Sequence, residues 1–204
     1  MQKILITGTT SGIGNFLATN LKDNYEIIGV GRGKNNIEGI DFFCGDLKEE
    51  YFLNNISQNI SKIDYLIINA GVGYFDKFEK INLKEHKEIL NINLISPIIL
   101  TSLLLDKINC GIIFIGSVSS KKSAKFGASY SASKFGLRGF AMNLKNELKG
   151  LNIYLINPKI VKTNFHKNSK IEIVGKYEET KIEIILSTIK NIIEKKENRF
   201  EIDL

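Results

Sequence analysis

The chain has little of the residue types that build disulfide frameworks and metal centres. It has 204 residues, of which 2 are cysteine, 2 are histidine and 2 are proline, and it has no tryptophan. Cys44 and Cys110 are too few for a disulfide framework or a zinc quartet, so we expect them to be buried free thiols. His86 and His166 have no carboxylate or thiolate near them at metal-ligand spacing. No metal site is expected.

Long apolar runs and a leader-like start are also lacking. No apolar run approaches the roughly 18 residues of a membrane-spanning helix. Residues 1–7 are strand-like and lead directly into a glycine loop, unlike the cationic and apolar start of a secretory leader. We therefore expect a soluble, cytoplasmic protein with no membrane partner.

Positive charge is plentiful, but arginine is scarce. The net charge of +6 comes almost entirely from lysine, because only 3 of the 28 basic residues are arginine. The lysines alternate with glutamate and asparagine along the expected helices. A nucleic-acid-binding surface would instead have its basic residues clustered. No specific nucleic-acid partner is expected.

Strand-like and helix-like stretches alternate along the whole chain. Short β-branched apolar runs, typical of buried parallel strands, are followed by longer stretches with apolar residues at helical spacing. This alternation predicts an α/β fold with a doubly wound, mostly parallel sheet of about seven strands and helices on both faces. A length of 204 residues, 43% of them apolar, predicts one domain over residues 1–204. The expected strands are 1–7, 26–30, 41–44, 64–68, 111–115, 152–156 and 199–203, and the later helices are 49–60, 83–105, 130–149 and 178–195, with Pro97 kinking or ending the second of these helices.

A glycine-rich loop connects the first strand to the first helix. It reads Thr7-Gly8-Thr9-Thr10-Ser11-Gly12-Ile13-Gly14. Glycines let the backbone tighten and approach a phosphate, and the N-terminus of the following helix offers free N–H groups. The same glycines could form only a tight connection, because the spacing is not the Gly-x-Gly-x-x-Gly fingerprint of dinucleotide folds. The loop is a phosphate-binding candidate that needs support from other positions.

That support comes from the end of the second strand, Gly31-Arg32-Gly33-Lys34. In a dinucleotide fold an acidic residue at this place holds the ribose 2′-hydroxyl, whereas an arginine receives a 2′-phosphate. Arg32 stands where the acid would be expected, and Lys34 adds positive charge. The pattern favours NADP(H) over NAD(H). In the alternative interpretation, Arg32 is an ordinary solvated loop residue.

A serine, a tyrosine and a lysine lie around the strand at 111–115. Ser117 follows the strand, and Lys134 lies one helical turn after Tyr130 and so on the same helix face. A phenol loses its proton near pH 10, so bringing its pKa to about 7 takes roughly 4 kcal/mol from a nearby ammonium and a second cation. A tyrosine tuned in this way exchanges protons with an alcohol or a carbonyl. Tyr177 and Lys181 have the same spacing, but no buried strand precedes them, and we interpret them as a solvated surface pair.

With these motifs in order, the chain resembles the short-chain dehydrogenase/reductase family over essentially its full length. The loop Thr7-Gly8-x-x-x-Gly12-Ile13-Gly14 is similar to the family's cofactor loop, and the interval between Ser117 and Tyr130 is the family's usual one. The other matching motifs are Asp46-Leu47, the adenine-contacting pair, Asn69-Ala70-Gly71, the fourth-strand motif, and Asn93, Ser117, Tyr130 and Lys134, the catalytic tetrad.

The resemblance implies a Rossmann-type fold and a role for each tetrad residue. Tyr130 would be the general acid/base, Ser117 would orient the substrate oxygen, Lys134 would bind the nicotinamide ribose and lower the Tyr130 pKa, and Asn93 would hold a proton-relaying water. The implied cofactor-binding residues are Gly8, Thr10, Ser11, Gly12, Ile13, Gly14, Arg32, Asp46, Leu47, Asn69, Ala70, Gly71, Tyr130, Lys134, Val161 and Thr163.

The chain departs from the family pattern in two places. Lys159 follows Pro158 where the family usually has glycine, which puts the local backbone in doubt. The lid segment over about 164–177 is short, which implies an open pocket for either a small substrate or a bulky, partly exposed one. Members of the family usually pair through the helices that hold Asn93 and Tyr130 or through the terminal strand. Because the terminus is curtailed, a homodimer is expected ahead of a tetramer.

The leading interpretation is an NAD(P)-dependent oxidoreductase. We expect it to reduce a small-molecule carbonyl with NADPH, or to oxidise a secondary alcohol in reverse. The alternative is a non-catalytic NAD(P)-binding regulator or scaffold, suggested by the short lid and Lys159.

Overall fold

A computed structural model of the chain describes residues 1–122, 125–165, 169–171 and 178–204. In this part of the chain, seven strands form one sheet in the order β3-β2-β1-β4-β5-β6-β7, and every neighbouring pair is parallel. The order turns outward in both directions from β1 and β4, as in doubly wound Rossmann-type folds. The strands are β1 (Lys3–Thr7), β2 (Glu26–Gly31), β3 (Asp41–Cys44), β4 (Ile63–Ile68), β5 (Ile108–Ile115), β6 (Asn152–Asn157) and β7 (Glu201–Asp203).

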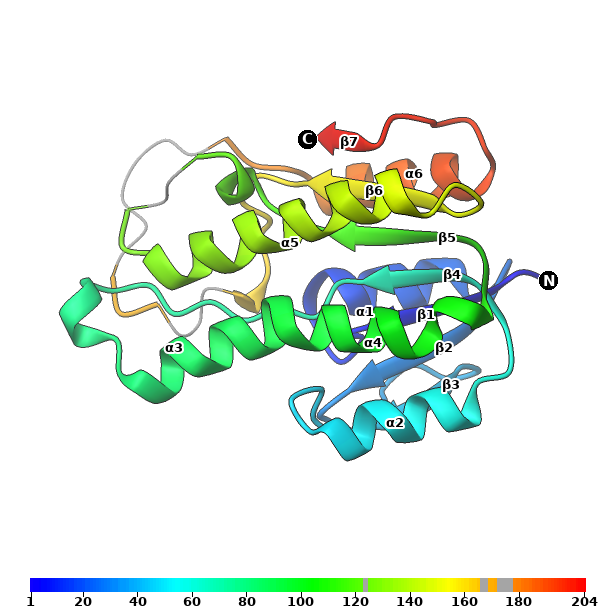
Figure 1. The fold of residues 1–204 in the computed structure, drawn as a ribbon, viewed down its shortest axis with the longest axis horizontal. Helices are drawn as coiled ribbons and strands as arrows, with labels where there is room; N and C mark the ends of the chain where they lie inside the picture. The colour runs from blue at the N-terminus through cyan, green and yellow to red at the C-terminus, as the bar shows by residue number, and fades with distance from the viewer. Residues whose placement is uncertain (123–124, 166–168, 172–177) are drawn as a thin grey trace.

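Helices cover both faces of the sheet (Figure 1). The α-helices are α1 (Gly12–Leu21), α2 (Glu50–Asn59), α3 (Leu83–Leu90), α4 (Ser96–Leu104), α5 (Ala128–Glu147) and α6 (Ile182–Ile193). Short helical segments are η1 (Phe78–Lys80), η2 (Asn91–Ile95), η3 (Leu105–Lys107) and η4 (Val118–Ser120), of which η2 is a π-helix. The predicted α/β fold is therefore confirmed.

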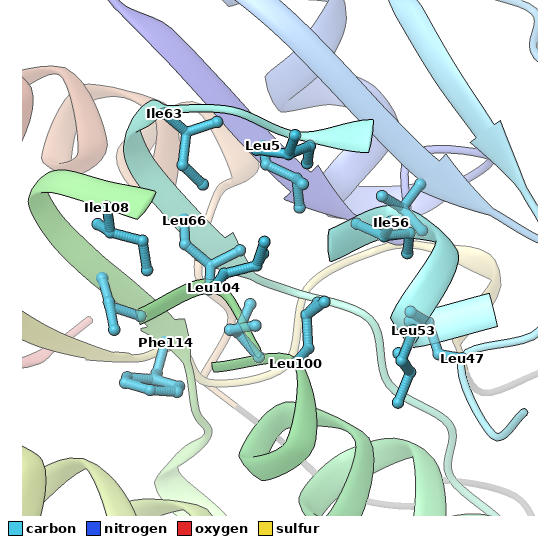
Figure 2. Close-up of a cluster of buried hydrophobic side chains, with 14 of the residues drawn as sticks. Leu5, Leu47, Leu53, Ile56, Ile63, Leu66, Leu100, Leu104, Ile108 and Phe114 are labelled. Carbon is cyan, nitrogen blue, oxygen red and sulfur yellow. The ribbon is translucent and has the colours of Figure 1, made fainter. Parts of the chain in front are cut away.

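Two apolar clusters, one on each face, form the core. On one face α2, α4 and α5 bury their apolar side chains against the sheet, with Leu66 and Phe114 from the central strands (Figure 2). On the other face α1 and α6 pack against residues such as Tyr65 and Ile67. Successive side chains of a strand point to opposite faces, so strands buried on both sides are apolar throughout.

The helix expected over 83–105 is interrupted in its middle. It consists of α3, the π-helix η2 and α4, and Pro97 lies in the first turn of α4. Proline has no N–H to donate to the carbonyl four residues earlier, which here belongs to Asn93. The π-turn takes up this break, with the Ser96 N–H bonded to the Asn91 carbonyl. Pro97 therefore interrupts the helix, as the sequence indicated.

The last helix starts later than the sequence indicated. Residues expected in its first turn bond to the segment after β6, where the Thr180 N–H donates to the Ile160 carbonyl at 2.9 Å and Glu179 pairs with Ile160. These tertiary contacts override the helical periodicity at Glu178–Thr180. Tyr177, the partner proposed for Lys181, lies outside the described residues, as does most of the expected lid over 164–177.

The two thiols are free, but they are not both buried. Cys44 is exposed and Cys110 is half-buried. The expectation of a buried Cys44 is wrong because β3 is an edge strand with few neighbours.

One continuous helical stretch among the described residues is long and apolar enough, by length and composition alone, to span a membrane. It runs from Leu83 to Lys107 and has a mean hydropathy of 1.7 in its most apolar window. Leu100 and Leu104 of this stretch are fully buried in the core cluster shared with α2. The later part of the stretch, α4, therefore contributes to the core.

Candidate active site

The candidate site lies at the carboxyl ends of the strands, where β1 and β4 are tied together. Thr7 Oγ1 accepts hydrogen bonds from the backbone N–H groups of Asn69 and Ala70, both at 3.0 Å. Asn69 Nδ2 donates to the Thr7 carbonyl at 2.9 Å. The predicted Asn69-Ala70-Gly71 motif therefore holds the base of the glycine loop in place through its hydrogen bonds to Thr7.

The glycine loop packs tightly against Asn69 and the end of β1. Gly8 has φ +79°, and a Cβ built on Gly14 would lie 2.3 Å from the Gly8 carbonyl oxygen and 2.5 Å from Asn69 Nδ2. Larger side chains would push the start of α1 away from β1. These two glycines are therefore required by the close approach of loop, strand and helix.

The start of α1 fits a phosphate group. Among the described residues, no side chain caps the helix at Ser11, and the buried Thr9 Oγ1 has no hydrogen-bond partner. Thr163 comes close to this point, since a Cβ on Gly12 would lie 3.6 Å from it. A cleft of about 460 Å³ runs from Gly12 along the side of α1, lined by Gly12, Asn15, Phe16, Thr19, Asn20, Lys162, Thr163, Asn164 and Ile182. Free N–H groups and a positive dipole end bind anions at such places.

Arg32 lies at the end of β2 in the position predicted from the sequence, but two carboxylates are beside it. Its Nη1 atom is 3.2 Å from Glu88 Oε1 and 3.8 Å from Asp46 Oδ2. Asp46 also lies 3.3 Å from Lys48 Nζ. The neighbouring Leu47 is buried in the core, which leaves Asp46 as the polar member of the predicted pair. Two cations and two carboxylates thus share this end of the site.

Other predicted cofactor residues lie along the same edge. Thr10 packs against Gly31, whose Cβ would lie 2.7 Å from Thr10 Cγ2, and so lies beside the Arg32 loop. Gly71 lies near Asn93, with its Cβ position 3.4 Å from Asn93 Oδ1. Ile13 is half-buried. Val161 is buried in the core, so little of its side chain is accessible to a ligand.

Ser117, Tyr130 and Lys134 come together as predicted. Ser117 lies just beyond β5, Tyr130 lies in the first turn of α5, and Lys134 Nζ is 5.9 Å from the centroid of the Tyr130 ring. The Lys134 ammonium donates to the Ile115 carbonyl at 3.0 Å. Tyr130 and Lys134 are 8% and 5% exposed, so both polar groups are withdrawn from bulk water.

Burial controls the protonation of this pair in the protein alone. It raises the pKa of Tyr130 to about 12, while a side-chain hydrogen bond with Ser117 acts in the opposite direction. It lowers the pKa of Lys134 to about 8. In the protein alone desolvation outweighs the neighbouring groups, and the pKa of Tyr130 is raised. The lowered pKa expected with a nicotinamide as the second cation stays a prediction. At neutral pH the phenol is protonated and able to donate.

Asn93 is held by hydrogen bonds to its neighbours. Its Oδ1 accepts from the Val72 N–H at 2.8 Å, and its Nδ2 donates to the Val72 carbonyl at 2.9 Å and to Ser133 Oγ at 3.0 Å. Ser133 Oγ in turn donates to the Tyr130 carbonyl at 2.7 Å. Asn93 therefore ties the loop after β4 to the helix that carries Tyr130.

Two phenylalanines that the sequence did not single out pack against the Tyr130 ring. The centroid of Phe75 is 5.2 Å from that of Tyr130, and the centroid of Phe165 is 5.7 Å from it. Phe75 follows β4 and Phe165 follows β6, so no local pattern connects either to Tyr130. The surroundings of the phenol are aromatic.

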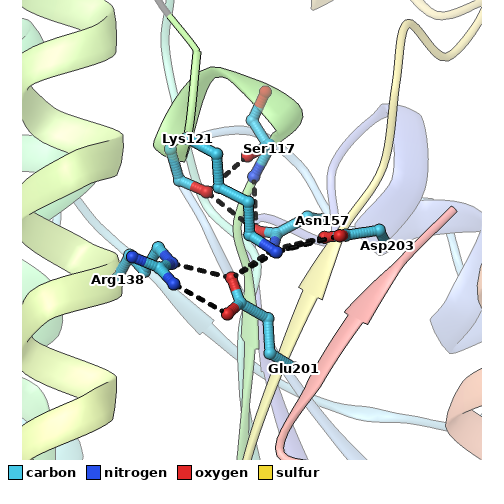
Figure 3. Close-up of polar contacts among 7 residues, drawn as sticks. Ser117, Lys121, Arg138, Asn157, Glu201 and Asp203 are labelled. Atoms are coloured by element: carbon cyan, nitrogen blue, oxygen red, sulfur yellow. Dashed lines mark hydrogen bonds and ion pairs between the residues drawn. The ribbon is translucent and has the colours of Figure 1, made fainter.

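A polar network supports Ser117 from the C-terminal strand (Figure 3). Asn157 Oδ1 accepts from the Ser117 N–H at 3.3 Å, and Asn157 Nδ2 donates to Glu201 Oε1 at 2.8 Å. Arg138 on α5 binds both oxygens of Glu201, at 2.8 and 3.0 Å. Asn157 could have been identified from the sequence as a polar residue that ends an apolar strand. No sequence pattern indicated that Arg138 and Glu201 belong to the same network.

Lys159 does not disturb the backbone where the family usually has glycine. Among the described residues, the non-glycine positions with positive φ are Phe126 and Lys195, so Lys159 needs no glycine conformation. Its N–H donates to Thr180 Oγ1 at 2.9 Å, and its ammonium pairs with the exposed Glu178. The side chain is directed to the surface.

The fold and the site together define an α/β dinucleotide-binding protein with a serine, a tyrosine and a lysine at the carboxyl edge of its sheet. Comparisons with known proteins agree. A family model described as short chain dehydrogenase matches residues 2–173. The protein belongs to the short-chain dehydrogenase/reductase family and is an NAD(P)-dependent oxidoreductase.

Three similar proteins illustrate the relationship. The 3-oxoacyl-(acyl-carrier-protein) reductase FabG of Buchnera aphidicola subsp. Acyrthosiphon pisum is 33% identical over an alignment of 183 residues, and the alignment covers 80% of this chain and 75% of that protein. The dehydrogenase/reductase SDR family protein 7-like of Dictyostelium discoideum is 28% identical and aligns with 82% of this chain, but only 61% of its own length is covered. The structure of 3-ketoacyl-(acyl-carrier-protein) reductase from Brucella melitensis complexed with NADH has a TM-score of 0.88 at 18% identity, covering 100% of this chain and 96% of that chain. This last likeness concerns the fold alone.

Proposed function

We propose that the protein reduces a carbonyl compound with NADPH, or oxidises the corresponding secondary alcohol in reverse. The observation that carries this proposal is the meeting of Ser117, Tyr130 and Lys134 beside the glycine loop. A bound nicotinamide cofactor would supply or accept the hydride. The residues that would hold it are those of the glycine loop, Arg32, Asp46, the Asn69 motif, Lys134 and Thr163.

Tyr130 is the proton donor for the carbonyl oxygen in this proposal. The phenol is protonated at neutral pH because burial raises the pKa of Tyr130 to about 12. Ser117 donates a second hydrogen bond to the same oxygen, which orients it and stabilises the charge that develops there. Lys134 holds its ammonium close to the phenol and stabilises the phenolate left after proton transfer.

Asn93 serves the return of the proton through its backbone. Its side-chain amide is engaged by Val72 and Ser133. Pro97 has no N–H for the Asn93 carbonyl, which therefore lacks its α-helical donor and is suited to hold a water. Such a water would connect the Tyr130 and Lys134 pair to solvent.

The first experiment is a fluorescence titration with NADPH and NADH, followed by turnover assays. The panel contains ketones, aldehydes, quinones and a 3-oxoacyl thioester, since a relative is named as a 3-oxoacyl reductase. We expect tighter binding of NADPH and oxidation of the cofactor by at least one carbonyl with an apolar flank, because Phe75 and Phe165 border Tyr130. Binding without turnover of any panel member would favour a nucleotide-binding regulator.

The protein also carries exposed apolar side chains on the helices around the site. Leu90, Ile95, Phe135 and Met142 are 38%, 43%, 47% and 40% exposed, and they belong to α3, η2 and α5. We propose that a homodimer covers them. Phe135→Glu should shift the protein to a monomer in light scattering, whereas Ile184→Glu on α6, where Ile184 is 44% exposed, should not. A wild-type monomer would contradict the dimer.

We also propose a cytoplasmic location and one domain over residues 1–204. The most apolar helical stretch, 83–107, contributes Leu100 and Leu104 to the core, and a single sheet carries both apolar clusters. Limited proteolysis should give no stable fragment that contains only part of the sheet.

A further inference from the structure

We propose that Glu88 is a specificity-determining residue for the cofactor. It competes with a ribose 2′-phosphate for Arg32 and thereby narrows the preference for NADPH over NADH. This inference rests on the proposed function, because it requires a nicotinamide dinucleotide along the strand ends. No sequence motif marks Glu88, which lies on α3, 56 positions from Arg32.

The contact between the two side chains is direct. Arg32 Nη1 donates to Glu88 Oε1 at 3.2 Å, whereas Asp46 Oδ2 is farther away, at 3.8 Å. The Glu88 side chain is 16% exposed, compared with 53% for Arg32 and 27% for Asp46. The closer carboxylate is thus also the better shielded one, and shielding strengthens an ion pair.

A tyrosine keeps the Glu88 carboxylate in place. Tyr74, in the loop after β4, donates its hydroxyl to the other oxygen of Glu88 at 2.9 Å. Burial and, after it, the hydrogen bond to Glu88 together raise the pKa of Tyr74 to about 12, so the phenol stays protonated and donates. Glu88 is therefore anchored on the side away from Arg32 and stays beside the guanidinium.

The position of the pair places it next to the predicted nucleotide. Arg32 follows β2 and Glu88 lies on the helix after β4, and β1, which carries the glycine loop, lies between these two strands in the sheet. The ion pair thus connects elements from both sides of the loop. A ribose that reached Arg32 would meet Glu88 at the same point.

The two dinucleotides differ in how they meet these charges. Arg32 and Lys48 are balanced by Asp46 and Glu88, so the cluster is formally neutral. A phosphate monoester carries close to two negative charges at neutral pH, and to bind Arg32 it must displace the Glu88 carboxylate from the guanidinium. The 2′-hydroxyl of NADH carries no charge and can donate to a carboxylate. Glu88 therefore weakens the binding of NADPH and not that of NADH.

The test is the dissociation constant of each dinucleotide, measured by fluorescence titration of wild type and Glu88→Gln. Glutamine keeps the volume and the acceptor for Tyr74, but it removes the charge. We expect the dissociation constant of NADPH to fall about fivefold and that of NADH not to fall. A fivefold change corresponds to roughly 1 kcal/mol, the size of one partly exposed ion pair. The fivefold gain should shrink at high salt.

A matched control changes the net charge by the same amount elsewhere. Glu147 is the exposed last residue of α5, and α5 packs on β6, which is separated from β2 by three strands of the sheet (Figure 1). Glu147→Gln should leave both constants unchanged. A gain for NADPH equal to that of Glu88→Gln would mean that net charge alone is responsible, and it would overturn the proposal.

A double-mutant cycle tests whether Glu88 acts through Arg32. In an Arg32→Ala background, Glu88→Gln should change the NADPH constant far less than in wild type. The same gain in NADPH affinity in both backgrounds would overturn the proposal that Glu88 competes for Arg32. An unchanged ratio of the NADPH and NADH dissociation constants in Glu88→Gln would also overturn it. Glu88→Ala is the second variant, and circular dichroism verifies folding. If wild type bound neither dinucleotide, the proposed function would fall first, and the same titration shows this before any variant is compared.

Discussion

Asn157 Nδ2 lies 2.8 Å from Glu201 Oε1, and this contact determines which way the Asn157 amide faces. A carboxylate only accepts hydrogen bonds, so the NH₂ group must point toward Glu201 and the carbonyl oxygen away from it. That oxygen accepts from the Ser117 N–H and from Ser120 Oγ, at 3.3 and 3.1 Å. The C-terminal strand therefore orients the loop that carries Ser117 (Figure 3).

Glu201 should make the fold sensitive to acid. The pKa of Glu201 is lowered to about 2, mainly by its hydrogen bonds to Arg138. The ionised Glu201 carboxylate therefore stabilises the fold above its ordinary pKa of 4.5, and this stabilisation is lost as pH falls toward 2. Glu201→Gln should reduce the free energy of unfolding at pH 7 by roughly 1–2 kcal/mol and flatten its decline in acid. Urea denaturation at several pH values measures both. Glu147→Gln is the control, and an unchanged acid slope in Glu201→Gln would count against the assignment.

Tyr130→Phe should remove turnover and leave cofactor binding intact. The variant keeps the ring in contact with Phe75 and Phe165 but has no proton to donate. Loss of a general acid lowers kcat by about 10²–10⁴-fold. Steady-state kinetics and an NADPH titration test this, with Tyr51→Phe, at a 73% exposed site, as the control. A Tyr130→Phe enzyme with most of its rate would remove Tyr130 from the mechanism.

Arg32→Ala should weaken the binding of NADPH about tenfold or more, and that of NADH much less. A charge-assisted contact to the 2′-phosphate is lost in the first case only. Lys34 is exposed two residues further on, so Lys34→Ala should have the smaller effect. Fluorescence titration measures all four constants. Equal losses for both dinucleotides would defeat the assignment of Arg32 to the phosphate.

Lys134→Met should stabilise the fold while it impairs catalysis. Burial lowers the pKa of Lys134 to about 8 from 10.5, so its charge disfavours the folded state below pH 8, and that cost disappears as pH rises toward 10.5. Methionine fills similar space without a charge, although it leaves the Ile115 carbonyl without this donor. We expect a gain of roughly 1–2 kcal/mol in the free energy of unfolding at pH 7.

Denaturant unfolding between pH 6 and 10 measures this gain. The difference between Lys134→Met and wild type should shrink above about pH 8. Lys145→Met, at an exposed position on the same helix, supplies the control. A variant less stable than wild type at every pH would show that the Lys134 hydrogen bond outweighs its desolvation.

Local sequence determined the elements and the chemical groups at their ends. Apolar runs of β-branched residues predicted strands such as the one at 111–115, which lies within β5 (Ile108–Ile115), and helical spacing placed Lys134 one turn after Tyr130. Glycine spacing located the loop after β1. These features depend on residues a few positions apart, so a linear pattern contains them.

Only the tertiary structure decided which distant side chains meet and what burial does to them. Arg32 meets Glu88, and Arg138 meets Glu201, across 56 and 63 positions. The raised pKa of Tyr130 and the late start of α6 likewise come from neighbours outside the local chain. Such contacts depend on which strands lie side by side and how deeply a group is desolvated, and no local periodicity encodes either.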